Sequence, residues 1–371
     1  MAVAQAGSAA PAVKSGLEEK STIPDISPSG TGSFEALCSD GGGGARASSV
    51  VRLYRALLRP LLRPVLRAAM RNQVSTGQSM LLMRTFFTLY GMPHANNDQI
   101  ALEFLSRLLP HEAEYLRART LYGSLRGQLM IAPVVGVPGI GRFVDVRTAW
   151  LDEALGEALG KGAVQGVIIA AGFDTRAYRF ARPGVCFFEI DLPGPSAEKR
   201  ALVDAALPDA GAHPRPTYIA ADLSKVSLSA ALEGSGFDPS RPSVFLAEGL
   251  IYYLPPQAVR ALFQAVAALA APGSRFCFDW LRLSCLSGRA LNCGFETLAT
   301  AVSNRGEPFL SALDDETPGA LDALARLFGF RCVSTAGARD MAAHFYGDKV
   351  PWWDHPATVA TCFCYAVFEK V

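Results

Sequence analysis

A glycine and an acid in the middle of the chain have types and spacing suited to ligand binding. Gly172 follows the apolar run at 167–171, and Asp191 ends a second apolar run nineteen positions later. A dinucleotide-binding fold uses an acid about 20 residues after its glycine turn to hold ribose hydroxyls. Glycine also lets the backbone approach a ligand closely. Together the two residues predict a site for a nucleoside.

The turn alone is weak evidence, because buried strands often end in small residues for packing reasons. Glu189 and Asp191 share one face of the second run, and Pro193 ends that run. Two carboxylates at the mouth of a strand favour a binding site over packing. The turn lacks the three glycines of a dehydrogenase, since Ala170 stands at the first position. We therefore expect a ligand with a ribose and without a pyrophosphate.

The elements around these residues alternate between strand and helix patterns. Apolar runs predict strands at about 165–170, 185–190, 217–221, 243–247 and 274–280. Helices are predicted near 195–207, 226–233 and 256–271. This alternation predicts a doubly wound parallel sheet, which binds ligands at the carboxyl ends of its strands. The residues that follow predicted strand ends are Gly172, Asp191, Asp222 and Glu248.

A further helix is predicted before the first strand, at about 144–159, with Arg147 off its apolar face and free to face a ligand. After the sheet strands, 281–317 has no regular pattern. A helix near 318–328 and two strands, near 330–335 and 359–369, complete the prediction.

These blocks resemble the leucine carboxyl methyltransferase family, which includes many S-adenosylmethionine-dependent O-methyltransferases. The resemblance runs from about Ser75 to about Trp280, with a weaker tail to Val371. Its blocks occur in order at Arg147-Thr148 with Asp152, 171–179, 189–193 with Lys199, 221–223 and 247–254. The resemblance implies a Rossmann-like class I methyltransferase sheet of the α/β class, with an antiparallel last strand and an N-terminal helical lid.

The resemblance also implies S-adenosyl-L-methionine as the cofactor and a role for each site residue. Arg147 corresponds to the arginine that pairs with the methionine carboxylate, a task that suits a planar, permanently charged fork. Asp191 corresponds to the acid that holds the ribose. Asp222 and Leu223 correspond to the pair that holds the adenine. Glu248 corresponds to the acid near the methionine end, and the Gly172 turn faces the cofactor.

Methyl transfer from a sulfonium needs alignment and exclusion of water more than a dedicated catalytic residue, so no catalytic residue is assigned. The expected acceptor is a carboxylate or a hydroxyl of a small molecule. A hydroxyl needs a base, for which His344 and His355 are the candidates. They lie in an aromatic segment with Trp352 that we expect in the loop before the last strand, either as a pocket wall or as a cap on the sheet edge. Tyr252 and Tyr253 are candidate acceptor-pocket residues.

Two other functions stay open. A non-catalytic S-adenosylmethionine-binding protein would keep the cofactor residues and lose the acceptor pocket. An NAD-dependent oxidoreductase would share the sheet and Asp191, but the three-glycine turn that it needs is missing.

Composition excludes several other classes. The 35 Lys and Arg residues balance the 34 Asp and Glu residues, giving a net charge of +1, whereas a nucleic-acid enzyme normally carries a basic surplus. The eight cysteines show no Cys-x-x-Cys spacing, so we expect no metal site. Their apolar surroundings indicate a reducing intracellular compartment, in the first instance the cytoplasm. No run approaches the roughly 20 apolar residues of a membrane span.

Three regions are predicted along the chain. Residues 1–49, rich in Ala, Ser and Gly, are expected to be a disordered tail. Residues 50–141 form an N-terminal helical arm and lid, and 142–371 the methyltransferase domain. The arm begins with a basic amphipathic segment at 50–72. We favour its packing on the catalytic domain; contact with a membrane surface and organelle targeting are the alternatives.

Overall fold

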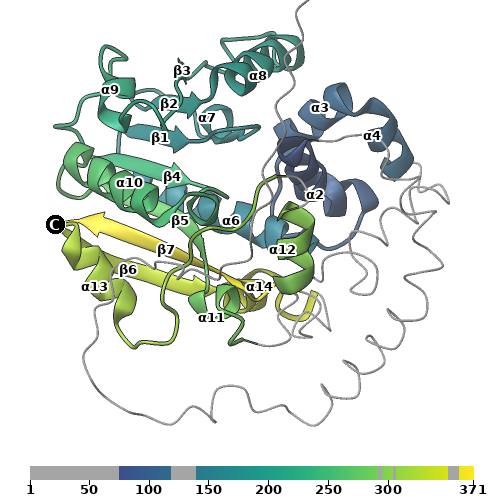
Figure 1. The fold of residues 1–371 in the computed structure, drawn as a ribbon. Coiled ribbons are helices and arrows are strands. Elements are labelled where there is room, and N and C mark those ends of the chain that lie inside the picture. Colours follow the sequence, from purple (N-terminus) through teal and green to yellow (C-terminus); the bar gives the residue numbers. More distant parts are fainter. Residues whose placement is uncertain (1–74, 118–138, 291–294, 304–305, 350–358) are drawn as a thin grey trace, which may run out of the picture.

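A single seven-stranded sheet with helices on both faces organises the chain (Figure 1). The computed structural model describes residues 75–117, 139–290, 295–303, 306–349 and 359–371. The strands are β1 Gln165–Ile169, β2 Cys186–Asp191, β3 Thr217–Ala220, β4 Ser243–Ala247, β5 Arg275–Leu281, β6 Phe330–Gly337 and β7 Phe363–Lys370. Their order is β3-β2-β1-β4-β5-β7-β6. This is the predicted doubly wound α/β sheet.

The first five strands pair in parallel, and β7 pairs antiparallel to both β5 and β6. Strands β1, β4 and β5 are buried along their whole length, which explains why they are near-continuous apolar runs. The chain order reverses at β1, between β2 and β4. Such a switch point is where open α/β sheets bind ligands.

Helices cover the two faces of the sheet through two separate apolar clusters. On one face pack α6 Ile140–Gly160 and α14 Ala338–Tyr346, against alternate strand residues such as Ile168. On the other pack α9 Leu228–Leu232, α10 Pro256–Leu269 and α13 Ala320–Leu327, against Val167 and Ile169. The alternation along β1 is that of a strand with both faces buried. The two short connections α7 Arg176–Arg179 and η1 Ile251–Tyr253 follow β1 and β4, and α8 Pro193–Ala206 follows β2.

Three N-terminal helices lie beside the carboxyl ends of the parallel strands (Figure 1). They are α2 Thr76–Tyr90, α3 Gln99–Leu108 and α4 Pro110–Arg117. A capping box of Ser75 and Gln78 begins α2, and Gly91, in the left-handed conformation, ends it. A third apolar cluster joins these helices to Leu202 and Val203 of α8. The helices are therefore anchored on the sheet domain; their action as a lid stays a prediction.

Two expectations about the C-terminal part are wrong. The segment 281–317 contains α11 Leu283–Leu286 and α12 Phe295–Ser303. The residues His344 to Tyr346 lie in α14, followed by η2 Gly347–Lys349, and not in a loop. In α14 the buried residues Ala338, Ala342 and Tyr346 recur every four positions. The helix is too short for this spacing to repeat often, and the many aromatic residues nearby make the pattern hard to recognise in the sequence.

Some predictions concern residues outside the described ranges: the tail 1–49, the basic segment 50–72, and His355 with its neighbour Trp352. Among the helices that the structure describes, none combines the length and apolar character that crossing a membrane requires.

Candidate functional site

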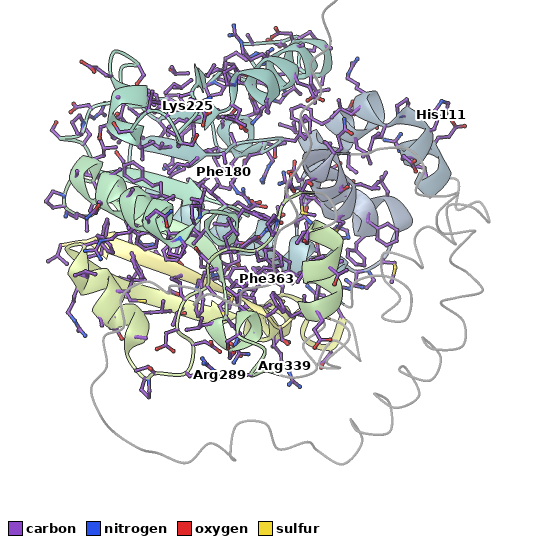
Figure 2. The ribbon with its side chains drawn as sticks, in the orientation of Figure 1. His111, Phe180, Lys225, Arg289, Arg339 and Phe363 are labelled. Carbon is purple, nitrogen blue, oxygen red and sulfur yellow. The ribbon has the colours of Figure 1, made fainter. Side chains whose placement is uncertain are left out.

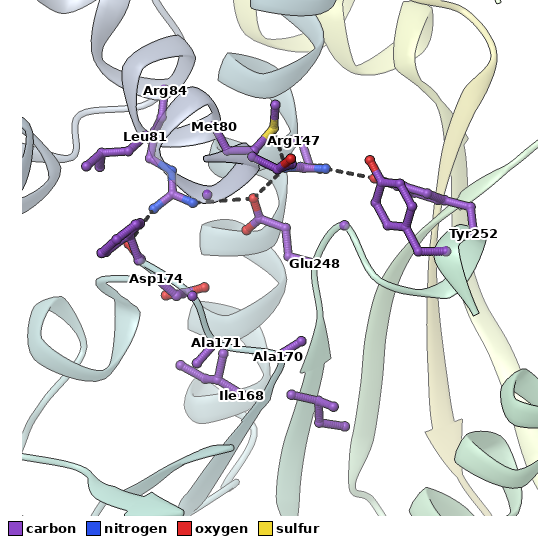
Figure 3. A pocket seen from close by; sticks show the side chains of 17 residues that line it. Met80, Leu81, Arg84, Arg147, Ile168, Ala170, Ala171, Asp174, Glu248 and Tyr252 are labelled. Carbon is purple, nitrogen blue, oxygen red and sulfur yellow. Dashed lines mark hydrogen bonds and ion pairs between the residues drawn. The ribbon is translucent and has the colours of Figure 1, made fainter. Parts of the chain in front are cut away.

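A cavity of about 170 Å³ lies at the switch point of the sheet (Figure 3). Its floor is formed by the end of β1 with the turn that follows it, at 168–174, and by the turn after β4, which begins at Glu248. Helix α2 covers it with Met80 and Arg84, and α6 contributes Arg147. Residues from four distant parts of the chain therefore meet at one point, at the edge of the sheet where the sequence predicts a site.

The turn after β1 is held against the end of β2. The backbone N–H of Gly172 donates to Oδ2 of Asp191 over 2.6 Å, and the N–H of Leu192 donates to Oδ1 over 2.7 Å. Gly172 has φ of 44° and Ala170 has φ of 55°, so the turn contains two left-handed residues. A β-carbon on Gly172 would meet no atom within 4 Å. The turn thus leaves open space beside the Asp191 carboxylate, as a close-approach site requires.

Glu248 lies among three guanidinium groups. Arg176 Nη1 donates to Oε2 over 2.6 Å, and Oε1 lies 3.1 Å from Arg147 Nη2 and 3.5 Å from Arg84 Nη2. Burial alone would raise the pKa of Glu248, but the positive charges of Arg176, Arg147 and Arg84 hold that pKa well below its ordinary value. The carboxylate is therefore ionised at any physiological pH.

Arg147 lines the cavity but is not free, in contrast to the prediction. Its Nη1 donates to the Tyr252 hydroxyl over 3.0 Å and to Asp279 Oδ2 over 3.1 Å, and Nη2 faces Glu248. Burial works against its charge, but Glu248 and Asp279 raise the pKa of Arg147 well above the ordinary value. Helical periodicity shows that a side chain lies off the apolar face, and it says nothing about partners more than a hundred positions away.

Sequence reasoning missed three residues of this charged cluster: Arg84, Arg176 and Asp279. Arg176 is fully buried and donates to Asp152 over 2.7 Å, to Glu248 and to the Thr148 carbonyl over 3.1 Å. The sequence did contain a signal for Arg176, because this residue lies inside the block 171–179 that carries the family resemblance. The signal for Asp279 is an acid inside an apolar strand, where an unpaired charge is unfavourable. Nothing local marks Arg84.

Asp222 and Leu223 lie outside the cavity, beyond the end of β3. The strand ends of β2 and β3 are adjacent, since Ala221 N–H donates to the Asp191 carbonyl over 2.8 Å. The Asp222 carboxylate accepts from the Ser224 hydroxyl over 2.6 Å and lies 2.8 Å from Lys225 Nζ, which is labelled beside α9 in Figure 2. Hydrogen bonds from these two residues lower the pKa of Asp222 to about 2.

The expectation that Glu189 shares the strand mouth with Asp191 is wrong. Glu189 is buried, and its Oε2 lies 2.7 Å from Nζ of the buried Lys199 on α8. Burial raises the pKa of Glu189 to about 7, while Lys199 acts in the opposite direction. Glu189 lies two residues before the end of β2. Its carboxylate contacts Lys199 of α8 and does not line the cavity.

The residues considered for the acceptor pocket divide into two groups. Tyr252 and Tyr253 line the cavity. Behind them Phe363 of β7, labelled in Figure 2, packs with its ring centroid 5.1 Å from that of Tyr252. His344 lies on the outer surface of α14 with Nε2 3.3 Å from Glu153, and it does not line the cavity. Of the two alternatives for the aromatic segment, His344 therefore does not fit the pocket wall.

Comparison with known proteins identifies relatives of part of the chain. The model of the leucine carboxyl methyltransferase family matches residues 91–267. A protein of Mycobacterium tuberculosis, provisionally named an S-adenosyl-L-methionine-dependent methyltransferase, is 45% identical over 135 residues, which are 36% of this chain and 37% of the relative. A protein of the same name from Mycolicibacterium vanbaalenii is 40% identical over 162 residues, 42% and 51% of the two chains. The matches thus span between about a third and half of these curated relatives.

A solved structure with a similar fold comes from Thermobifida fusca and is provisionally described as a methyltransferase. It is 17% identical, covers 80% of this chain and 97% of its own, and has a TM-score of 0.46.

Proposed function

Residues 91–267 belong to the leucine carboxyl methyltransferase family, and on this premise we propose that the chain is a methyltransferase that uses S-adenosylmethionine to methylate a small molecule on oxygen. The acceptor group is a carboxylate or a hydroxyl. The observation that carries the proposal is the ion pair of Arg147 with Glu248 beside the turn after β1, whose Gly172 N–H donates a hydrogen bond to Asp191.

The charges in the cavity fit the amino-acid end of the cofactor. That end carries a carboxylate and an ammonium group, which need a cation and an anion close together. Arg147 and Glu248 supply them at 3.1 Å from each other. Both keep hydrogen-bonding capacity, because Arg147 Nε makes no hydrogen bond among the described residues and Glu248 Oε1 makes only ion pairs, with Arg147 and Arg84. Arg147 is suited to hold the carboxylate and Glu248 the ammonium group.

The turn after β1 and the end of β2 fit the nucleoside end. Each oxygen of Asp191 accepts one backbone N–H, so each keeps acceptor capacity for a ribose hydroxyl. The left-handed Gly172 leaves the space beside that carboxylate open. Asp222 and Leu223, at the end of the next strand, lie on the side where the adenine would extend, and we propose that they hold it.

When bound, the cofactor supplies a methyl group on a positively charged sulfur, which needs no further activation. The chain's residues then have to orient the acceptor and exclude water. Among the described residues that line the cavity, Glu248 stays ionised, and burial together with the Asp279 charge raises the pKa of Tyr252. Glu248 is therefore only a weak base, because the three arginines hold its pKa low, and Tyr252 stays protonated at neutral pH. This favours an acceptor that is already ionised, namely a carboxylate.

The cavity is smaller than the range of about 300–1,000 Å³ that is usual for ligand pockets. Met80 and Arg84 of α2 line the cavity next to Glu248 (Figure 3), and Arg84 Nη2 lies 3.5 Å from Glu248 Oε1. We infer that α2 moves outward to admit the cofactor and closes again over it, which gives the N-terminal helices their role as a lid.

Calorimetric titration with S-adenosylhomocysteine and with NAD tests the proposal. The expected result is binding of S-adenosylhomocysteine and no binding of NAD, with Asp191→Ala weakening the interaction by roughly 1–3 kcal/mol. Binding of NAD alone would favour the oxidoreductase alternative. A screen of small metabolites with methyl-labelled S-adenosylmethionine then identifies the acceptor. Cofactor binding with transfer only to nitrogen, sulfur or nucleic acid contradicts the O-methylation part of the proposal.

A further inference from the structure

Asp279 is a fully buried acid in the middle of β5, whose other residues apart from the terminal Arg275 are apolar. Its neighbours on β5, Phe278 and Trp280, are buried as well. An ionised carboxylate in such surroundings is strongly unfavourable unless its oxygens are well paired. The partners of Asp279 therefore explain why this position carries an acid.

All three donors to Asp279 belong to residues that line the cavity. The Gly249 N–H donates to Oδ1 over 2.6 Å, and Oδ2 accepts from the Tyr252 hydroxyl over 3.0 Å and from Arg147 Nη1 over 3.1 Å. Asp279 itself does not line the cavity. It therefore acts on the site only through these three residues, which come from α6, the turn after β4 and η1.

The consequence for Arg147 is a fixed orientation. A guanidinium group is a rigid planar fork, so a contact that fixes one arm also fixes the direction of the other. Asp279 and Tyr252 hold Nη1, and Nη2 is left facing Glu248 inside the cavity. The turn packs closely on the same arm, since a β-carbon on Gly249 would lie 3.2 Å from Nη1.

We propose that Asp279 is a positioning residue, which orients Arg147 so that its inner arm meets the carboxylate at the amino-acid end of the cofactor. This role rests on the proposed function. It is separate from the ribose and adenine contacts, which are made at the ends of β2 and β3. Loss of Asp279 is thus expected to lower the affinity only for ligands that carry the amino-acid chain.

Two ligands of the full-length chain separate these contacts. S-Adenosylhomocysteine has the amino-acid chain, whereas 5′-methylthioadenosine keeps the adenine, ribose and thioether without it. For Asp279→Asn we expect the affinity for S-adenosylhomocysteine to fall about 10- to 100-fold, the range for a lost hydrogen bond to a charged group. The affinity for 5′-methylthioadenosine should stay within about twofold of that of the wild type.

Asp315→Asn is the matched control. Asp315 is also a nearly buried carboxylate that accepts from an arginine, Arg282, over 2.8 Å and from the hydroxyl of Ser284 over 2.6 Å. It does not line the cavity, so both affinities should be unchanged in this variant. If Asp279→Asn lowers the affinity for both ligands equally, Asp279 has a general structural role and the proposal is overturned. An unchanged affinity for S-adenosylhomocysteine overturns it as well.

A double variant covers the case in which Asp279→Asn does not fold because Arg147 loses its partner. Arg147→Met with Asp279→Asn removes both charges together, and it is compared with Arg147→Met alone. If Asp279 acts through Arg147, the second substitution should change the affinity for S-adenosylhomocysteine by less than about twofold. A further tenfold loss would overturn the role. A wild-type chain that binds neither ligand would instead refute the proposed function, and this role with it.

Discussion

Ala170 holds a backbone conformation that suits glycine better than any other residue. Its φ of 55° places its β-carbon close to the following carbonyl oxygen, which costs about 1–2 kcal/mol. The turn that needs this conformation is the one that brings the Gly172 N–H to Asp191. Backbone strain is therefore located at the candidate site, where the geometry of the turn matters more than its stability.

Ala170→Gly should stabilise the chain. Relief of the strain exceeds the extra chain entropy of a glycine, so we expect the free energy of unfolding to rise by about 0.5–1 kcal/mol. Chemical denaturation measures it. Ala171→Gly is the control, because Ala171 is buried without a positive φ and its replacement should destabilise. A loss of stability in both variants would contradict the strain argument.

The buried Glu189 makes stability depend on pH. Its pKa of about 7 in the folded chain, raised by burial, exceeds the value of about 4.3 expected in the unfolded chain. Between these two values the folded state binds more protons, so stability falls as pH rises from about 4.5 to 7. Glu189→Gln removes this titration. Relative to the variant, the wild type should lose about 1–3 kcal/mol across that interval.

Denaturation curves at pH 5, 6 and 7 test this expectation. The exposed neighbour Glu198, changed to Gln, should follow the wild type at every pH. Parallel curves for the wild type and Glu189→Gln would mean that Lys199, at 2.7 Å, fully compensates the burial.

Helix α2 is the element that connects the N-terminal helices to the chemistry. Its apolar residues Leu82 and Phe86 belong to the third cluster, while Met80 and Arg84 line the cavity. One helix thus packs on its neighbours and covers the site at the same time. A movement of α2 that admits a ligand should leave the sheet strands in place.

Ser75→Ala tests α2 as the moving element. It removes the oxygen that accepts from the Gln78 N–H, which should destabilise the start of the helix by about 1 kcal/mol. Hydrogen exchange should speed up over the first turn of α2 and stay unchanged in β1. In the wild type, S-adenosylhomocysteine should slow hydrogen exchange in α2. No protection of α2 by this ligand would contradict the lid.

Ser227→Ala is the matched control at the element scale. Ser227 caps α9 in the same way, through the Ala230 N–H, but α9 packs on the sheet away from the cavity. Exchange should speed up locally in α9 in this variant, with no change in the effect of the ligand on α2.

At the scale of the whole molecule, the N-terminal helices and the sheet domain share buried apolar surface. The third cluster contains Leu82 and Phe87 of α2 together with Tyr178 of α7 and Leu202 of α8. Burial of such side chains contributes about 1.5–3 kcal/mol each. The described N-terminal helices therefore contribute to the stability of the sheet domain.

Two deletions test how far this dependence extends. Removal of residues 1–49 should leave the melting temperature unchanged, because their composition does not provide the apolar area that a packed segment needs. Removal of 1–90 also takes away α2 and should lower the melting temperature by many degrees. Differential scanning calorimetry measures both. A loss of several degrees in the shorter deletion would refute the prediction for the tail.

The sequence by itself determined the sheet and the residues at its strand ends. Strands such as β1 and β4 are near-continuous apolar runs, and the turn after β1 is marked by Gly172. These signals are local, so one strand and its turn are enough to reveal them. The approach of Gly172 to Asp191 follows from the same pattern, since neighbouring parallel strands end at one edge.

Only the tertiary structure decided which charges meet in the cavity. Arg84 and Glu248, or Arg147 and Asp279, are more than a hundred positions apart, and no local pattern pairs them. The same limit explains why the sequence left the place of His344 open, since its position on the outer surface of α14 depends on how that helix packs on α6. Periodicity determines elements because it repeats within them, whereas ion pairs form between elements and depend on how those elements pack.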